Sequence, residues 1–176
     1  NGGGSAADYI IEVLDRELTG YFNSRTRSHK VFTQPMAALW GPKVMVINEL
    51  AGSGGDLMPF LFRFRKIGPL VGKKTWGGLV HTADTPPLMD GGRFVAPRGG
   101  FFNVDGEWDV EGKGIAPDPG LDVGNDPKAV AAGHDPQLEA AVAEALRRLQ
   151  TEGVQLKAEP PAPVRYHRPV RPGGGN

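Results

Sequence analysis

The sequence predicts an α/β fold, because a strand, a helix and a second strand follow one another in its first half. The apolar run Val44 to Ile47 indicates a buried strand, and Leu70-Val71-Gly72 indicates another. The intervening segment 57–66 is typical of a helix, with Pro59 tolerated in its first turn. This order favours a parallel pair of strands joined by a right-handed crossover.

Helices are expected on either side of this unit. Apolar residues recur with helical spacing from Ser5 to Leu18, where Ser5 is a typical N-cap and Gly20 a typical terminator. Near the other end, Asp135-Pro136 is a strong helix start, and the apolar spacing continues to Gly153.

Turn-forming residues separate short extended segments in the middle of the chain. Asp90-Gly91-Gly92 and Asp105-Gly106 each lie between two such segments, so we expect two hairpins. The segment 154–176 is rich in proline, arginine and glycine, and we expect it to be extended or disordered. Residues 1–153 are then expected to form part of a single domain.

Composition excludes several classes of function. Twenty Lys and Arg residues balance twenty Asp and Glu residues, so there is no electrostatic case for binding nucleic acid or an anionic membrane. The absence of cysteine excludes disulfides and thiol catalysis. Neither a leader peptide nor a membrane-spanning apolar run is recognisable, so we expect a cytoplasmic protein.

The candidate reactive group is Ser53, which lies in the turn Ala51-Gly52-Ser53-Gly54-Gly55 between the first strand and its helix. A hydroxyl there would meet backbone N–H groups and the positive end of a helix dipole, as a nucleophile with an oxyanion hole requires. An ordinary helix-capping serine is the alternative. The run Gly2-Gly3-Gly4 precedes another expected helix and is a second potential anion-binding corner.

A serine nucleophile needs a base, and the sequence contains no convincing one. His81 is the single histidine in the strand-rich centre, and a buried Lys73 or Lys74 is a further option. The other histidines lie in polar or terminal segments: His29, His134 and His167. Glu111 is a candidate orienting acid, or else an ordinary turn carboxylate. Neither metal-ligand spacing nor a phosphate-loop lysine is present, so we expect no metal and no cofactor.

Together these segments resemble the C-terminal catalytic core of tricorn-type serine proteases, relatives of the C-terminal processing peptidases. The resemblance extends from Asn1 to about Leu149. It rests on five segments: Asn1-Gly-Gly-Gly4, 41–53, 70–78, 110–118 and His134-Asp-Pro-Gln137.

The resemblance implies a role for several residues. Ser53 would be the nucleophile, and the oxyanion hole would combine the N–H of Gly54 with one from Gly3 or Gly4. Glu111 would orient the catalytic histidine through an intervening serine. The implied fold is a crotonase-like or Clp-protease-like α/β core with repeated ββα units.

Two departures from the family pattern bear on mechanism. Gly78 occupies the place of the lysine base of processing peptidases, so the histidine-using tricorn type fits better. The catalytic histidine would then precede Asn1, and the isolated chain is expected to be nearly inactive. Phe22 stands near the place of the family's specificity aspartate, which implies an apolar preference, with Gly77 and Gly78 as further substrate-binding residues.

The resulting prediction is a serine endopeptidase that acts through an acyl-enzyme on Ser53. Its expected partners are peptide substrates, the upstream part of the same protease and further copies of itself. A non-catalytic binding or assembly module of the same fold is the first alternative. A crotonase-fold acyl-CoA enzyme, whose glycine N–H groups would bind a thioester oxyanion, is the second.

Overall fold

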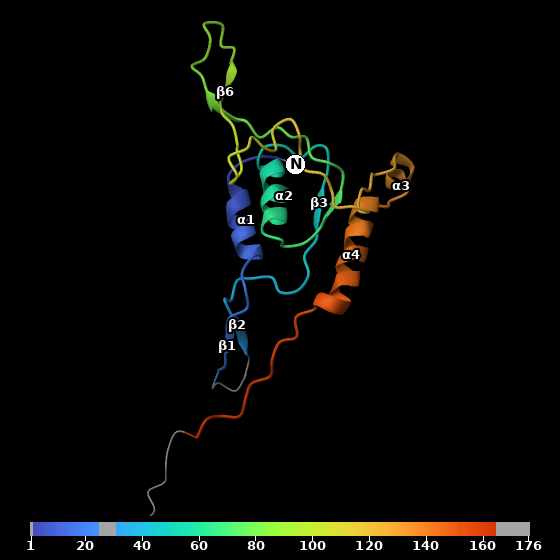
Figure 1. Ribbon diagram of the computed structural model, residues 1–176. Helices are drawn as coiled ribbons and strands as arrows, with labels where there is room; N and C mark the ends of the chain where they lie inside the picture. The colour runs from blue at the N-terminus through green and yellow to red at the C-terminus, as the bar shows by residue number, and fades with distance from the viewer. Residues whose placement is uncertain (1, 25–30, 165–176) are drawn as a thin grey trace, which may run out of the picture.

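A parallel pair of strands joined by a helix forms the centre of the computed structural model, which describes residues 2–24 and 31–164 (Figure 1). Strand β3 (Met45–Ile47) pairs with β4 (Leu70–Gly72), and Val46 lies opposite Val71. Helix α2 (Gly54–Phe64) connects the two strands. All three residues of β4 are buried, as its uninterrupted apolar run predicts. The predicted α/β class and the parallel pairing are confirmed.

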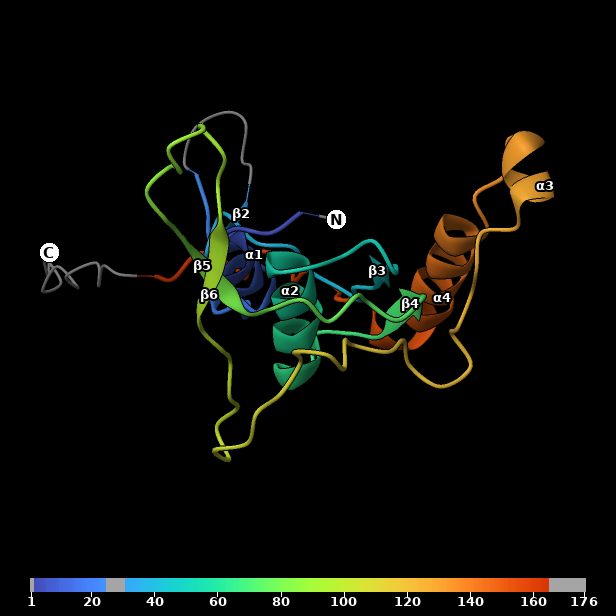
Figure 2. The same cartoon turned by 90° about the horizontal axis from the view of Figure 1, so that it is seen from above.

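Helices cover this strand pair on two sides. Helix α1 (Ala6–Leu14) packs against α2, whereas α4 (Pro136–Glu152) contacts β3 and β4 from the opposite side (Figures 1 and 2). The core is filled by side chains from α1, α2, the two strands and the loop that follows them: Ile11, Ile47, Phe62, Leu70, Val110 and Ile115.

The helix bounds differ from the sequence prediction at the end of α1 and at the start of α2. Helix α1 ends at Leu14 rather than near Leu18, because the chain beyond it enters an antiparallel hairpin and Thr19 N–H donates to Gln34 O at 2.9 Å. Gly20 accordingly begins a strand instead of ending a helix. Ser5 makes no side-chain capping bond to α1. Helix α2 begins at Gly54, three residues before the predicted start, whereas Asp135 caps α4 as predicted through Leu138 N–H at 3.0 Å.

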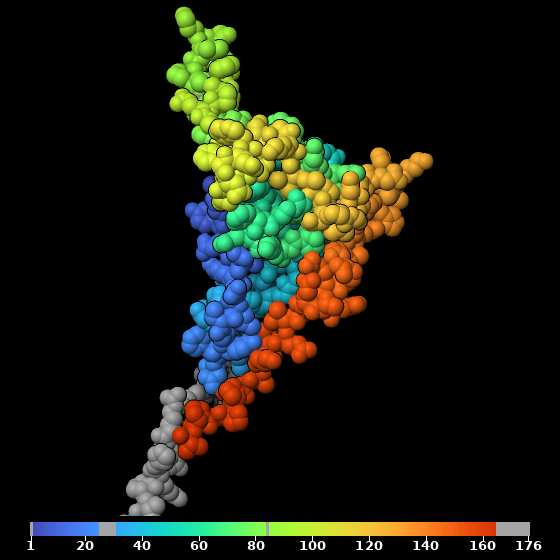
Figure 3. All heavy atoms as spheres, in the orientation of Figure 1, coloured from blue at the N-terminus to red at the C-terminus, as the bar shows by residue number. Residues whose placement is uncertain are grey.

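Two antiparallel hairpins extend from this core. Strand β1 (Gly20–Phe22) pairs with β2 (Phe32–Gln34) beyond the C-terminal end of α1. Strand β5 (His81–Asp84) pairs with β6 (Val95–Gly99) and forms a narrow arm that projects from the body (Figure 3). The second predicted hairpin is present in reduced form, as a bridge between Phe102 and Trp108.

The chain after α4 has no regular secondary structure through residue 164. It returns to the first hairpin, where Lys157 N–H donates to the Tyr21 hydroxyl at 3.2 Å and Asn23 Nδ2 donates to Glu159 at 2.5 Å. The remaining helix, α3 (Pro127–Ala131), is a short turn before α4. Within the described residues, every helix is too short or too polar to cross a membrane.

Candidate active site

Ser53 lies at the junction of the central strand and helix α2, and its backbone conformation is unusual. Its φ of 56° and ψ of −119° fall in a region that L residues rarely adopt, at a typical cost of about 1–3 kcal/mol. The N–H of Ser53 donates to Gly78 O at 2.7 Å, and its carbonyl accepts from the N–H groups of Asp56 and Leu57. These bonds hold the strained conformation in place.

The Ser53 side chain is exposed and makes no capping hydrogen bond to α2. The alternative of a helix-capping serine is therefore wrong, since a capping side chain accepts from the N–H of the second or third helical residue. A serine held at positive φ, with its hydroxyl directed away from the helix that it begins, has the arrangement of a presented nucleophile.

The glycine turn at the N-terminus lies directly against this serine, although the two are fifty residues apart in sequence. A methyl group on Gly3 would lie 2.5 Å from both Cβ and Oγ of Ser53, and one on Gly54 would lie 2.5 Å from Gly4 O. Within the described residues, the N–H groups of Gly3, Gly4 and Gly54 donate to no acceptor. Three free backbone donors thus lie around one hydroxyl, at the positive end of an eleven-residue helix. Asn1 lies outside the described residues.

Residues 76–80 form a short segment without regular secondary structure that connects the other parts of the site. Trp76 N–H donates to Ala51 O at 2.9 Å, and Gly78 O accepts from Ser53. On the same segment, the N–H groups of Leu79 and Val80 both donate to Glu111 Oε2, at 2.5 and 2.6 Å. The serine and the glutamate are therefore both bound to this one segment.

Glu111 is exposed, and its second carboxylate oxygen accepts no hydrogen bond within the described residues. The carboxylate is fixed by one oxygen and free at the other, as an acid that orients a further group would be. Its backbone is set by Val110, a buried residue with φ of 69°, and by Gly112 N–H, which donates to Gly77 O at 2.7 Å.

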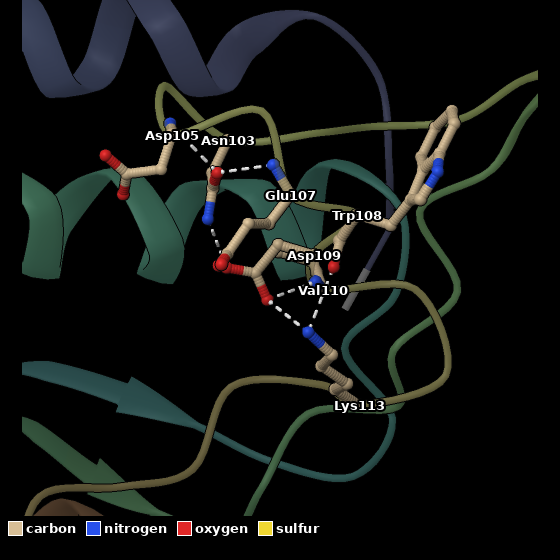
Figure 4. A network of polar contacts seen from close by, with 7 residues as sticks. All are labelled: Asn103, Asp105, Glu107, Trp108, Asp109, Val110 and Lys113. Atoms are coloured by element: carbon tan, nitrogen blue, oxygen red, sulfur yellow. Dashed lines mark hydrogen bonds and ion pairs between the residues drawn. The ribbon is translucent and has the colours of Figure 1, made fainter.

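A polar network supports the turn that presents Glu111 (Figure 4). Asp109 Oδ1 accepts from Val110 N–H at 2.8 Å and from Lys113 Nζ at 3.3 Å, and Lys113 also donates to Trp108 O at 3.0 Å. The hydrogen bond from Val110, aided by the Lys113 charge, lowers the pKa of Asp109 below its ordinary value. Asn103 Oδ1 closes the neighbouring hairpin by accepting from the N–H groups of Asp105 and Glu107.

Asp56 is the residue at this site that the sequence reasoning missed. Its side chain is fully buried in the first turn of α2, where it accepts from Gly77 N–H at 2.8 Å and Gly78 N–H at 2.9 Å. The available signal was an aspartate three residues after the serine, but such a residue is ordinary in the first turn of any helix. Because both glycine N–H groups donate to Asp56 and both carbonyls accept, Gly77 and Gly78 have structural roles here.

Other predicted residues lie away from Ser53. Phe22 is half-exposed on β1 and stacks on Phe32 at 5.5 Å, beyond the end of α1 opposite to the glycine turn (Figure 1). His81 is exposed, with its ring against Gly99, and His134 pairs with Glu139 at 3.1 Å.

Neither candidate lysine lies at the serine. Lys73 pairs with Asp122 at 2.5 Å, and Lys74 is exposed rather than buried. His29 and His167 fall outside the described residues. No histidine or lysine of the described segments forms a hydrogen bond with Ser53.

Two further features lie apart from the site. A cavity of about 270 Å³ lies near the C-terminal end of α1, between Leu18, Trp40 and Ile67 among others, so it does not adjoin Ser53. Burial lowers the pKa of Lys43, which lines this cavity. Across the described segments, no three His, Asp or Glu side chains gather in a way that could hold a metal ion.

Comparisons with known proteins agree with this geometry. Residues 1–120 match peptidase family S41. The chain is 36% identical over 150 residues to tricorn protease homolog 1 of Streptomyces coelicolor, covering 85% of this chain and 14% of that protein. It is 32% identical over 160 residues to the tricorn protease of Thermoplasma acidophilum, covering 91% of this chain and 15% of that protein.

Among solved structures, the crystal structure of the tricorn protease superposes with a TM-score of 0.79 at 32% identity, over 86% of this chain and 14% of that one. The chain thus spans about one seventh of the length of these relatives. Within that span, the matched residues contain Ser53, Glu111 and the glycine turn, and the chain belongs to peptidase family S41.

Proposed function

We propose that this chain supplies the nucleophile, the oxyanion hole and the orienting acid of a serine peptidase. The observation that supports this most directly is the packing of Gly3 and Gly4 against Ser53 and Gly54, which leaves three N–H groups unpaired around an exposed hydroxyl. Ser53 Oγ would attack the scissile carbonyl of a peptide. The N–H of Gly54, with that of Gly3 or Gly4, would stabilise the negative charge that develops on the carbonyl oxygen.

The reaction would proceed through an acyl-enzyme. Attack by Ser53 forms the ester and releases the amine, and water then hydrolyses the ester and restores the hydroxyl. Both steps require a base, and no histidine or lysine among the described residues forms a hydrogen bond with Ser53. We propose that the base is a histidine of the longer protease, oriented by Glu111. Within this chain, His81 is the first candidate to replace it.

The membership in family S41 and the names of the relatives also support finer proposals. The β3–α2–β4 unit would belong to a crotonase-like core made of residues 1–153, with 154–176 as an appended tail. The substrates would be peptides, the working form would be an oligomer that includes the upstream part of the protease, and the location would be cytoplasmic. Phe22 would reach a substrate only from a neighbouring element or copy, since it lies at the far end of α1.

Covalent labelling by a fluorophosphonate tests the proposal. In the chain combined with the base-bearing part of the protease, we expect Ser53→Ala to abolish labelling, because the reagent reacts with a serine oxygen that a base activates beside oxyanion donors. Ser5→Ala is the matched control, since Ser5 is exposed at the start of the other N-terminal helix and makes no side-chain capping bond. Labelling of Ser53→Ala equal to that of the unaltered chain would exclude Ser53 as the nucleophile.

A non-catalytic binding module remains the second candidate, because Ser53 has no base beside it within the described residues. The two candidates differ when the base-bearing part of the protease is added to the chain. A peptidase gains Ser53-dependent hydrolysis of peptides, whereas a binding module retains peptides without cleaving them.

A further inference from the structure

We infer that Asp56 is a positioning residue for the nucleophile: its buried carboxylate fixes the Gly77–Gly78 backbone, which in turn holds Ser53 in its strained conformation. This inference rests on the proposed function of Ser53. It concerns a residue that forms no contact with the Ser53 hydroxyl in the described structure and that acts through the backbone.

The side chain of Asp56 is the most completely buried charged group of the described residues, with an exposure of 0%. It takes part in no ion pair among them. Its two oxygens instead each accept one backbone N–H, Oδ1 from Gly77 and Oδ2 from Gly78. A buried carboxylate without a cation is costly unless its oxygens are satisfied. The position of Asp56 in the first turn of α2 adds the favourable helix dipole.

The bonds of Asp56 form a closed ring with Ser53. The Asp56 N–H donates to Ser53 O at 2.9 Å, the Asp56 carboxylate binds Gly78 N–H, and Gly78 O accepts from Ser53 N–H at 2.7 Å. Ser53 is therefore held at both its N–H and its carbonyl by groups that Asp56 connects. A conformation that costs free energy persists only where neighbouring bonds determine it in this way.

The direction of these bonds requires a carboxylate, rather than an amide, at position 56. Gly77 and Gly78 both present donors, so the site needs two acceptor oxygens. An asparagine has the same shape but would place its NH₂ group against one of these N–H groups, which removes one bond and sets two donors against each other. Asp56→Asn should thus loosen the Gly77–Gly78 backbone while α2 stays folded.

Amide hydrogen exchange followed by NMR measures this loosening directly in the 176-residue chain. In Asp56→Asn we expect the Ser53 amide to exchange about tenfold faster or more, because the loss of a buried bond favours local opening. Asp118→Asn is the matched control: Asp118 accepts from Leu70 N–H at 2.6 Å, at the opposite end of β4. That variant should speed exchange at Leu70 and leave Ser53 unchanged.

Fluorophosphonate labelling of the chain combined with the base-bearing part of the protease supplies the functional readout, resolved into reversible binding of the reagent and the rate of the covalent step. A misplaced nucleophile should slow the covalent step by about 10–100-fold in Asp56→Asn, with reagent binding and circular dichroism unchanged. Asp118→Asn should keep the wild-type covalent rate even if its thermal stability falls as far as that of Asp56→Asn.

The inference and the proposed function would be contradicted by different experimental results. Unchanged exchange at Ser53 in Asp56→Asn, or an equal loss of labelling in Asp118→Asn, would overturn the positioning role. A wild-type chain that stays unlabelled in the presence of the base-bearing part of the protease, while its Ser53 amide still depends on Asp56, would instead contradict the proposed function alone. If Asp56→Asn does not fold, Asp56→Ser, which retains one acceptor oxygen, is subject to the same two measurements and the same criteria.

Discussion

At the scale of single residues, glycine at position 3 is required by space rather than by backbone conformation. A methyl group there would lie 2.5 Å from Cβ and Oγ of Ser53, closer than nonbonded carbon and oxygen atoms approach. Gly2, one residue earlier, has open space around it, with nothing within 4 Å of such a methyl group. The space around Gly2 therefore admits a side chain, whereas the space around Gly3 does not.

With the base-bearing part of the protease present, Gly3→Ala should consequently lower fluorophosphonate labelling of Ser53 by about 100-fold, because the methyl group displaces the hydroxyl. Gly2→Ala should label at the wild-type rate. Circular dichroism checks that both variants keep their helices. Equal labelling of the two variants would contradict the described packing of the glycine turn.

At the same scale, the residues of the candidate site differ in how far the sequence could identify them. Ser53 and Glu111 were predicted from a turn motif and a family resemblance, and the structure binds both to the segment 76–80. Asp56 was not predicted, because its role depends on two N–H groups that lie twenty residues further along the chain. Phe22 was predicted from its position in sequence, but the hairpin that bears it folds away from Ser53.

At the scale of elements, the turn 108–113 depends on one carboxylate. The N–H of Val110 and the charge of Lys113 hold the pKa of Asp109 below its ordinary value, so the ionised form is favoured in the folded state. Stabilisation of this kind is fully present above the unfolded pKa of about 3.9 and disappears as the pH falls through the folded pKa. Acid should therefore loosen the turn that presents Glu111.

Asp109→Asn tests this dependence. Its free energy of unfolding should lie below that of the wild type at neutral pH, and the difference should vanish as the pH falls through the lowered pKa of Asp109 in the folded state. Urea unfolding at several pH values measures the difference. Asp105→Asn is the control, since the Asp105 carboxylate makes no hydrogen bond or ion pair within the described residues. A difference that does not change with pH would exclude the linkage.

The elements were predicted best where local chemistry decides them. The strands β3 and β4 follow from apolar runs, and α4 follows from Asp135-Pro136 at its start and Gly153 at its end. The early end of α1 was not predicted, because Thr19 pairs with Gln34 across a hairpin and this tertiary contact overrides the helical spacing. The early start of α2 was missed because Gly54 and Gly55 favour no particular backbone conformation on their own.

At the scale of the whole molecule, the face of α4 that packs against its own chain is not its apolar face, which is left exposed. Gln137 and Ala141 are buried against the strand side, where Gln137 Nε2 donates to Val123 O at 2.9 Å. The apolar residues of the same helix are about half exposed: Leu138, Val142, Leu146 and Leu149. An exposed apolar stripe of this kind marks a surface that associates with another protein surface.

We expect this apolar stripe to drive concentration-dependent self-association of the isolated chain. The double variant Leu138→Glu with Leu149→Glu should remove that association, because it places charge at both ends of the stripe while keeping helix-compatible side chains. Sedimentation velocity at rising concentration measures it. Val164→Glu changes an exposed apolar residue outside α4 and should associate as the wild type does. Undiminished association of the double variant would place the contact elsewhere.

The hydrogen bonds of the segment 76–80 also determine from which side a peptide can approach. Every N–H from Gly77 to Val80 already donates within the chain, two to Asp56 and two to Glu111. An incoming peptide thus finds no donors there with which to form an added β-strand. The N–H groups of Gly3 and Gly4 donate to no acceptor within the described residues, and Gly3 packs against the Ser53 side chain. A substrate backbone at Ser53 would accordingly find free N–H partners at the N-terminal glycines rather than in the segment 76–80.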